Sequence, residues 1–262
     1  MSHHMRWFKS FIKRIKSREL LISSHQDVSP TYDSSLLAKV VVKKNMKLVD
    51  MLETGSIPKL DFILLRPLLI FALTQKNKLN VFDLGGGGGT HYHVTRKLMN
   101  NGVNLKWAVL ETPSMVAEAK SISNEELSFF SEYSHAIKFL ENIDIALASS
   151  VFQYLSDPIA QLIKFIDLNA DVIFITRTAL TDNSSTLKVI QKSRLKDNGP
   201  GSLPDDFQDS EIQYPLTVVN KELFIKTLSK KYRIICEIEE DRDVHEINGQ
   251  SVNQYGFLCI RK

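Results

Sequence analysis

Five consecutive glycines at 85–89 constrain the fold of this chain more than any other feature. Ordering each glycine costs backbone entropy, roughly 0.5–1 kcal/mol relative to alanine. A flexible linker would lie between polar segments, but this run follows the apolar residues Val81, Phe82 and Leu84 and precedes a helical pattern. A parallel-sheet domain holds its ligand at such a strand-to-helix turn, where glycine lets the ligand approach the main chain. We therefore interpret 85–89 as a ligand-binding turn.

From about residue 79, short β-branched runs alternate with helical patterns, which predicts parallel strands joined by right-handed crossovers. The expected strands are 79–84, 105–111, 127–130, 143–149 and 171–176. The expected helices lie near 90–101, 113–121, 133–141, 158–168 and 220–230. Two last strands, 232–240 and 254–262, are too close together for a crossover helix and predict an antiparallel hairpin. The expected fold is α/β: a doubly wound, mostly parallel seven-stranded sheet with an antiparallel last strand.

The chain divides into two expected parts, a helical amino-terminal extension or cap (1–78) and the sheet domain (79–262). In the extension, 33–53 and the apolar 61–75 have helical patterns. The segment 5–20 has an apolar face surrounded by basic residues, so it either rests on an anionic membrane surface or packs on the domain or a partner. The polar stretch 178–219 is expected to be an insertion that forms a lid.

The glycine spacing separates ligand classes. The dinucleotide fingerprint G-x-G-x-x-G needs a third glycine where this chain has Thr90 or His91, and no Gly-Lys-Ser/Thr completes a Walker pattern. The pattern that fits is D-x-G-x-G-x-G, formed by Asp83, Gly85, Gly87 and Gly89. With it, the sequence from about 79 to 262 resembles the class I S-adenosylmethionine-dependent methyltransferases, whose last strand is also reversed. LGGGGGTHYHV and LETP further resemble a small group of bacterial methyltransferases linked with surface-polysaccharide loci.

The resemblance implies S-adenosylmethionine as the cofactor. Glu111 ends the second strand, where a carboxylate can accept hydrogen bonds from both ribose hydroxyls; a solvated strand-end glutamate is the alternative. The end of the third strand would contact the adenine, the stretch after the fourth would pass under the methionine part, and His91 would lie at the mouth of the site. The residues expected to hold the cofactor are Asp83, Gly85, Gly87, Gly89, Thr90, His91, Glu111, Thr112, Ser131, Glu132, Ser149, Ser150 and Val151.

Methyl transfer would be an in-line attack by a substrate atom, and a hydroxyl nucleophile benefits from a nearby base. His245, in the expected hairpin tip 239–251, is the first candidate base, with an exposed loop histidine as the alternative. Arg177, at the end of the fifth strand, would hold an anionic substrate group or form a structural salt bridge. Tyr154 would act at the site or serve in packing.

No metal site is expected, because His91 and His93 point to different faces of a helix and no cysteine or carboxylate follows at ligand spacing. The stretch after the fourth strand, 149–152, lacks the Asn/Asp-Pro-Pro-Tyr sequence of family members that methylate base or amide nitrogens. Together with a formal charge of only +3, this favours a small molecule, above all an oxygen of a saccharide or related metabolite, over nucleic acid.

Cellular location is predicted from the cysteines and the first residues. Cys236 and Cys259 lie in strand-like runs and are expected to be buried free thiols, and 1–20 has no uninterrupted apolar core. These features predict a cytoplasmic protein. Two alternative functions stay open: a catalytically silent binding protein with the same fold, and a nicotinamide-dependent oxidoreductase, which Thr90 disfavours. The sequence leaves the oligomeric state open.

Overall fold

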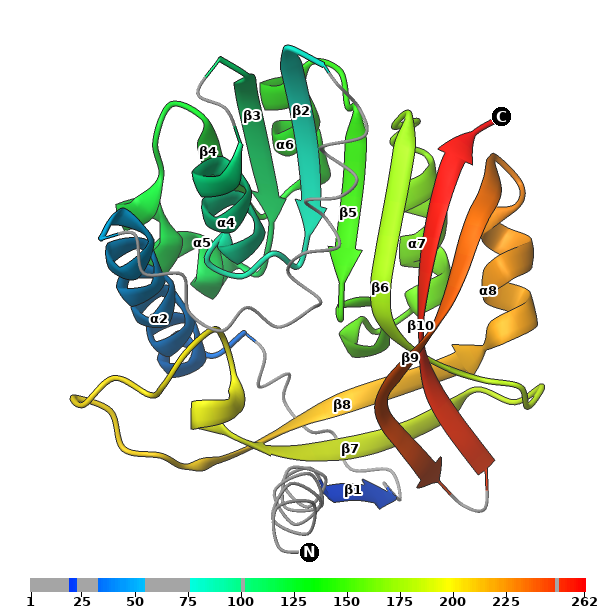
Figure 1. Ribbon diagram of the computed structural model, residues 1–262. Helices are drawn as coiled ribbons and strands as arrows, with labels where there is room; N and C mark the ends of the chain where they lie inside the picture. Colours follow the sequence, from blue (N-terminus) through cyan, green and yellow to red (C-terminus); the bar gives the residue numbers. More distant parts are fainter. Residues whose placement is uncertain (1–18, 23–32, 55–75, 100–101, 248–249) are drawn as a thin grey trace, which may run out of the picture.

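The computed structural model describes residues 19–22, 33–54, 76–99, 102–247 and 250–262, with the backbone alone at 19–22 and 241–245. The five expected parallel strands are all present. They are β2 (Lys78–Leu84), β3 (Asn104–Leu110), β4 (Leu127–Phe130), β5 (Ile145–Ser149) and β6 (Val172–Thr181). Their order in the sheet, β4-β3-β2-β5-β6, brings the carboxyl ends of all five to one edge (Figure 1).

The expected hairpin adds two strands to the sheet beside β6. Strand β10 (Gln250–Arg261) lies antiparallel between β6 and β9 (Tyr232–Ile247), so seven strands form the core and one of them is reversed. The predicted fold class is therefore confirmed. The expected tip at 239–251 is wrong in extent, because paired strand continues to Ile247 and resumes at Gln250.

Five helices follow strands of the sheet, and three of them begin at a side-chain cap. The five helices are α4 (Thr90–Leu98), α5 (Pro113–Ala119), α6 (Tyr133–Leu140), α7 (Pro158–Ile166) and α8 (Lys221–Leu228), with short 3-10 turns η2 (Lys120–Ile122), η3 (Phe152–Tyr154) and η4 (Leu195–Asp197). The side chains of Thr112, Asp157 and Asn220 accept from backbone N–H groups three residues later and so cap α5, α7 and α8. The caps expected at Asp157 and Asn220 are confirmed.

Both faces of the sheet are covered around β2, β5 and β6, which explains why these strands are buried on almost every residue. On one face, Val81 and Trp107 pack with α2 (Ser35–Glu53), α4 and α5. On the other, Phe82 packs with α6 and α7, in part through ring contacts with Tyr133 and Phe165. Helix α2 confirms the pattern expected at 33–53 and shares the core of the sheet domain.

The stretch 178–219 differs from the expected polar lid because much of it is strand. Strand β6 continues to Thr181, and β7 (Leu187–Arg194) pairs antiparallel with β8 (Glu211–Asn220). Two of the inward side chains of β7 are the buried polar residues Gln191 and Ser193, so the segment has a polar composition although it is folded into the sheet.

The amino-terminal part can be compared only in places. Strand β1 (Glu19–Ile22) pairs antiparallel with β7, so the end of the amphipathic segment 5–20 is strand, contrary to expectation. The rest of that segment, and the apolar 61–75, lie outside the described residues. No helix of the described ranges has both the length and the apolar character needed to cross a bilayer.

The two cysteines differ in exposure. Cys259 is buried, and burial raises the pKa of its thiol to about 12. Cys236 is exposed, contrary to the expectation of two buried thiols. It lies on β9, which pairs with β10 alone among the described strands, and the neighbouring Ile235 is exposed as well. Both thiols are free, as expected.

Candidate functional site

The glycine turn leaves β2 at the carboxyl edge of the sheet and leads into α4. Its alternate residues have left-handed backbones, with φ of +68° at Gly85, +57° at Gly87 and +78° at Gly89. Space is restricted too, because a Cβ added at Gly85 would lie 2.5 Å from Cγ2 of Val151, and one at Gly86 would lie 2.5 Å from Oδ2 of Asp83. Glycine is therefore required both by the conformation and by the neighbours of the turn.

Glu111 connects the turn to the next strand end. One carboxylate oxygen accepts from the Gly87 N–H at 2.9 Å, and the other accepts from the Thr112 N–H at 2.9 Å. Burial raises the pKa of the Glu111 carboxyl, and the nearby Asp83 adds to this, whereas the two N–H donors lower it. The carboxylate thus lies at the ends of β2 and β3, where the resemblance places the ribose of the cofactor.

Asp83 supports the turn from inside the protein. It is 1% exposed, and Oδ2 accepts from Nε1 of Trp107 at 3.1 Å. The ring of His91 is also buried, with Nδ1 3.6 Å from the same carboxylate oxygen. His91 therefore lies under the turn instead of at the mouth of the site. It points away from His93, as their spacing on a helix predicts.

A second polar group lies at the same edge, where β5 ends beside Thr176 and Arg177 of β6. Arg177 does not end its strand, contrary to the sequence prediction, because β6 continues to Thr181. Nε and Nη2 of Arg177 donate to the Ser149 hydroxyl at 3.2 and 3.1 Å. The amide of Gln153 donates to the Ser150 hydroxyl and to the Arg177 carbonyl, each at 3.1 Å. Ser150 and Arg177 both have positive φ, which is uncommon for residues other than glycine. These contacts join the end of β5, the residues that follow it up to η3, and the middle of β6.

The remaining expected site residues are more dispersed. Ser131 and Glu132 are exposed after β4, at the same sheet edge. Tyr154 is half-buried against the ring of Tyr214, and its hydroxyl donates to Gln191 at 3.1 Å. The backbone of His245 pairs opposite Val252 on β10. The side chain of His245 lies outside the described part, so its role as a base stays a prediction.

Helix α2 covers the glycine turn; the sequence predicted a helical extension or cap at 1–78 but not the residues that make this contact. Val41 and Asn45 contact Gly87 and Gly88 closely enough that an added Cβ would lie 3.4 and 2.7 Å from them. The hydroxyl of Thr90 donates to the amide oxygen of Asn45, which is fully buried. Only tertiary packing brings these residues together. The one local sign is an asparagine among the buried positions of an apolar helix.

Lys44 holds the same helix to the loop after β7. It is 2% exposed, and its ammonium donates to the carbonyls of Lys196 and Asn198 at 2.7 Å each. Burial lowers the pKa of Lys44. Because Val41, Lys44 and Asn45 lie on one face of α2, this face contacts both the glycine turn and the insertion.

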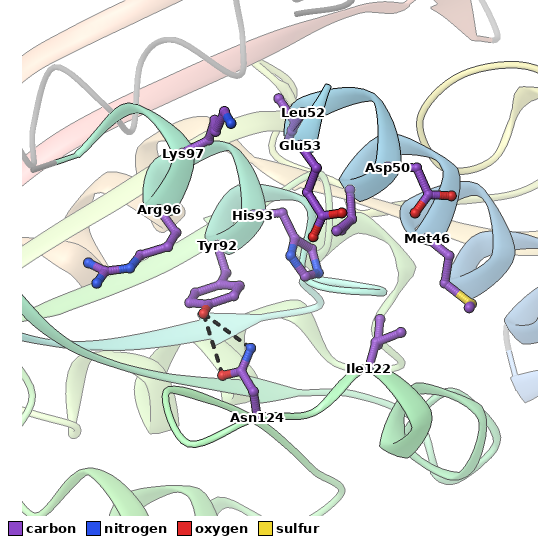
Figure 2. A pocket seen from close by; sticks show the side chains of 11 residues that line it. Met46, Asp50, Leu52, Glu53, Tyr92, His93, Arg96, Lys97, Ile122 and Asn124 are labelled. Carbon is purple, nitrogen blue, oxygen red and sulfur yellow. Dashed lines mark hydrogen bonds between the residues drawn. The ribbon is translucent and has the colours of Figure 1, made fainter. Parts of the chain in front are cut away.

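A separate pocket of about 600 Å³ lies between α2, α4 and the residues before β4 (Figure 2). Tyr92 and His93 project into it from α4, and the Tyr92 hydroxyl contacts Asn124. Burial lowers the pKa of His93 to about 4, although a hydrogen bond to the Gly88 backbone raises it in part. The ring is therefore neutral at pH 7. Residues 85–89 do not line this pocket, and no cluster in the described ranges has the ligands for a metal ion.

No protein-family model matches the sequence, and a search of curated proteins gives no match. Several solved structures are similar. The [4+2]-cyclase SpnF is 11% identical with a TM-score of 0.51, covering 91% of this chain and 99% of that chain. Magnesium protoporphyrin IX methyltransferase from Synechocystis PCC 6803 is 11% identical with a TM-score of 0.48, covering 84% of each chain.

The 1,6-didemethyltoxoflavin-N1-methyltransferase from Burkholderia thailandensis is 12% identical with a TM-score of 0.48, covering 94% of this chain and 96% of that chain. At such identities the likeness is one of fold. Together with the strand order β4-β3-β2-β5-β6-β10-β9 and the reversed β10, it shows that this chain has the Rossmann-like methyltransferase fold.

Proposed function

We propose that this protein is an S-adenosylmethionine-dependent methyltransferase that acts on an oxygen of a small molecule, a saccharide or related metabolite. The observation that carries the proposal is the bond between Glu111 and the Gly87 N–H. It places an acceptor carboxylate beside a turn with three left-handed glycines, at the carboxyl ends of two parallel strands. A nucleoside that bears an amino acid needs both features, open main chain for one part and an acceptor for its sugar hydroxyls.

In this proposal the chain binds and orients, and the bound cofactor supplies the activated methyl group. The glycine turn and the strand ends with Thr112, Ser131, Glu132 and Val151 would hold the cofactor. Arg177 would bind the acceptor, and His245 would take the proton from its hydroxyl. Helix α2 and the loop it holds would exclude water from the turn. Alignment and exclusion of water are what the protein adds when the reagent is already activated.

The proposal is tested by calorimetry with S-adenosylmethionine and its demethylated product, each compared with NADH. We expect the two nucleosides to bind and NADH to give no heat. Glu111→Ala should weaken product binding about tenfold or more, corresponding to about 1.4 kcal/mol, while substitution of the exposed Glu125 by glutamine should leave it unchanged. Binding of NADH without either nucleoside would overturn the proposal.

A catalytically silent binding protein is the second candidate, and two contacts favour it. The guanidinium of Arg177 and the hydroxyl of Tyr154 are both hydrogen-bonded within the protein. In addition, a similar fold occurs in a protein described as a [4+2]-cyclase, so the fold by itself leaves the reaction open. Release of the demethylated product in the presence of a panel of hydroxylated acceptors separates the candidates, because a silent protein releases none.

We further propose that the protein lies in the cytoplasm and that the basic segment 5–20 contacts an anionic membrane. Co-sedimentation with vesicles that contain phosphatidylserine tests this contact. Binding that weakens as salt is added would support it, because salt screens the attraction between basic residues and an anionic surface. The proposed contact would be contradicted if the same fraction of the protein sedimented with neutral vesicles as with anionic ones.

A further inference from the structure

Strand β6 carries one extra residue relative to β10 near the middle of its length. Thr176 and Arg177 together face the single residue Gly256. The flanking pairs are Ile175 with Phe257 and Thr178 with Tyr255. This arrangement is a β-bulge, and φ of +55° at Arg177 makes it a strained one. Bulges next to a site redirect a side chain, so the question is what maintains this one.

Glu240 of β9 holds the bulge. It is 3% exposed, and its Oε1 accepts from the Thr176 hydroxyl and, at 3.0 Å, from the Arg177 N–H. The carboxylate reaches across β10 because Gly256 has no side chain: an added Cβ there would lie 2.8 Å from the same oxygen. Glu240 thus accepts hydrogen bonds from both bulged residues of β6, although its own strand, β9, is separated from β6 by β10.

The bulge determines where the guanidinium of Arg177 lies. The side chain reaches β5 and donates twice to the Ser149 hydroxyl, and Gln153, in the turn that follows β5, donates to the Arg177 carbonyl. Ser150, which follows Ser149, has φ of +57°. Two residues with strained backbones, one just after β5 and one in the middle of β6, are held by buried Glu240 and Gln153, so this position is maintained at a cost.

We propose that Glu240 is a positioning residue, which maintains the bulge and so holds the Arg177 guanidinium where it binds a carboxylate or phosphate group of the methyl acceptor. A guanidinium suits either group because its planar N–H pairs match two oxygens at once. The inference rests on the proposed function for the identity of the acceptor. Its anion site can nevertheless be tested without methyl transfer.

The experiment titrates inorganic phosphate and, separately, acetate into the protein, with and without the demethylated cofactor product. We expect at least one anion to bind. Glu240→Ala should weaken that binding about tenfold, and Glu240→Gln should restore it, since a glutamine oxygen accepts the same two bonds. Substitution of the exposed neighbour Glu239 by alanine is the control and should have no effect. The product itself should bind all variants equally.

A second variant covers the case in which Glu240→Ala does not fold. Gly256→Ala should displace the Glu240 carboxylate without removing its charge. This variant should therefore weaken anion binding as well. With an acceptor from the hydroxyl panel, both variants should raise the acceptor KM more than they lower kcat. The inference is overturned if Arg177→Met or Glu240→Ala leaves anion binding unchanged. It is also overturned if the wild-type protein binds neither phosphate nor acetate. Absence of product binding would instead contradict the proposed function.

Discussion

Gly85 is subject to two separate constraints at the residue scale, a left-handed backbone and the lack of room for a side chain. Its φ is +68°, and an added Cβ would lie 2.5 Å from Val151. We expect Gly85→Ala to lower the free energy of unfolding by about 2–4 kcal/mol, roughly 1 from backbone strain and the rest from overpacking. Gly201 has φ of +73° with nothing within 4 Å, so Gly201→Ala should cost only about 1 kcal/mol. Urea denaturation measures both, and equal losses would show that the contact with Val151 is unimportant.

Glu111 should make cofactor affinity depend on pH. Burial raises the pKa of its carboxyl above the ordinary value of 4.5, so the acid takes up a proton at a higher pH than an exposed glutamate does. The protonated form loses acceptor capacity for the ribose hydroxyls. Affinity for the demethylated product should therefore weaken as pH falls through the raised pKa, which calorimetry at a series of pH values measures. Glu111→Gln should bind more weakly at neutral pH and show less of this dependence.

The residues that the sequence predicts best are those whose geometry follows from their own strand and turn. The backbone of Gly85, Gly87 and Gly89 and the position of Glu111 follow from a motif that joins one strand to one helix. Asn45 and Glu240, in contrast, reach their positions from elements far away in the chain. Asn45 leaves one local sign, a polar residue among the buried positions of an apolar helix, but neither side chain shows in the sequence which distant residue it contacts.

At the scale of elements, two neighbouring lysines of α2 contact the loop after β7, Lys44 through buried hydrogen bonds and Lys43 through an exposed ion pair. The Lys44 ammonium satisfies the carbonyls of Lys196 and Asn198, whereas the neighbouring Lys43 forms an exposed ion pair with Asp206. Lys44→Met keeps the apolar stem but leaves carbonyls without a donor, so we expect a loss of about 2–3 kcal/mol. Lys43→Met should cost about 0.5 kcal/mol or less. Equal urea midpoints for the two variants would contradict the attachment.

Strands with alternating polarity were harder to predict than apolar ones. Strands β2, β5 and β6 are buried along almost their whole length, and their apolar runs indicate them directly. Strand β7 instead alternates, but it turns Gln191 and Ser193 inward along with Val189. Its polar inward residues obscured the period of two on which a strand prediction depends. The pairing of β7 with β8 therefore appears only in the folded chain.

At the scale of the whole molecule, His93 should couple folding to protons, because it lies where α4 meets α2. Burial lowers its pKa from 6.5 to about 4, so below pH 6.5 the unfolded chain takes up a proton that the folded chain excludes. Stability should then fall as pH falls from about 6.5 to about 4, by about 2 kcal/mol at pH 5 from this residue. His93→Asn should reduce the difference between urea unfolding free energies at pH 7.5 and pH 5 by that amount. Substitution of the exposed His135 by asparagine is the control and should leave that difference unchanged. If the His93 variant also keeps the wild-type difference in unfolding free energy, then His93 is not the residue that links the packing of α2 and α4 to acid sensitivity.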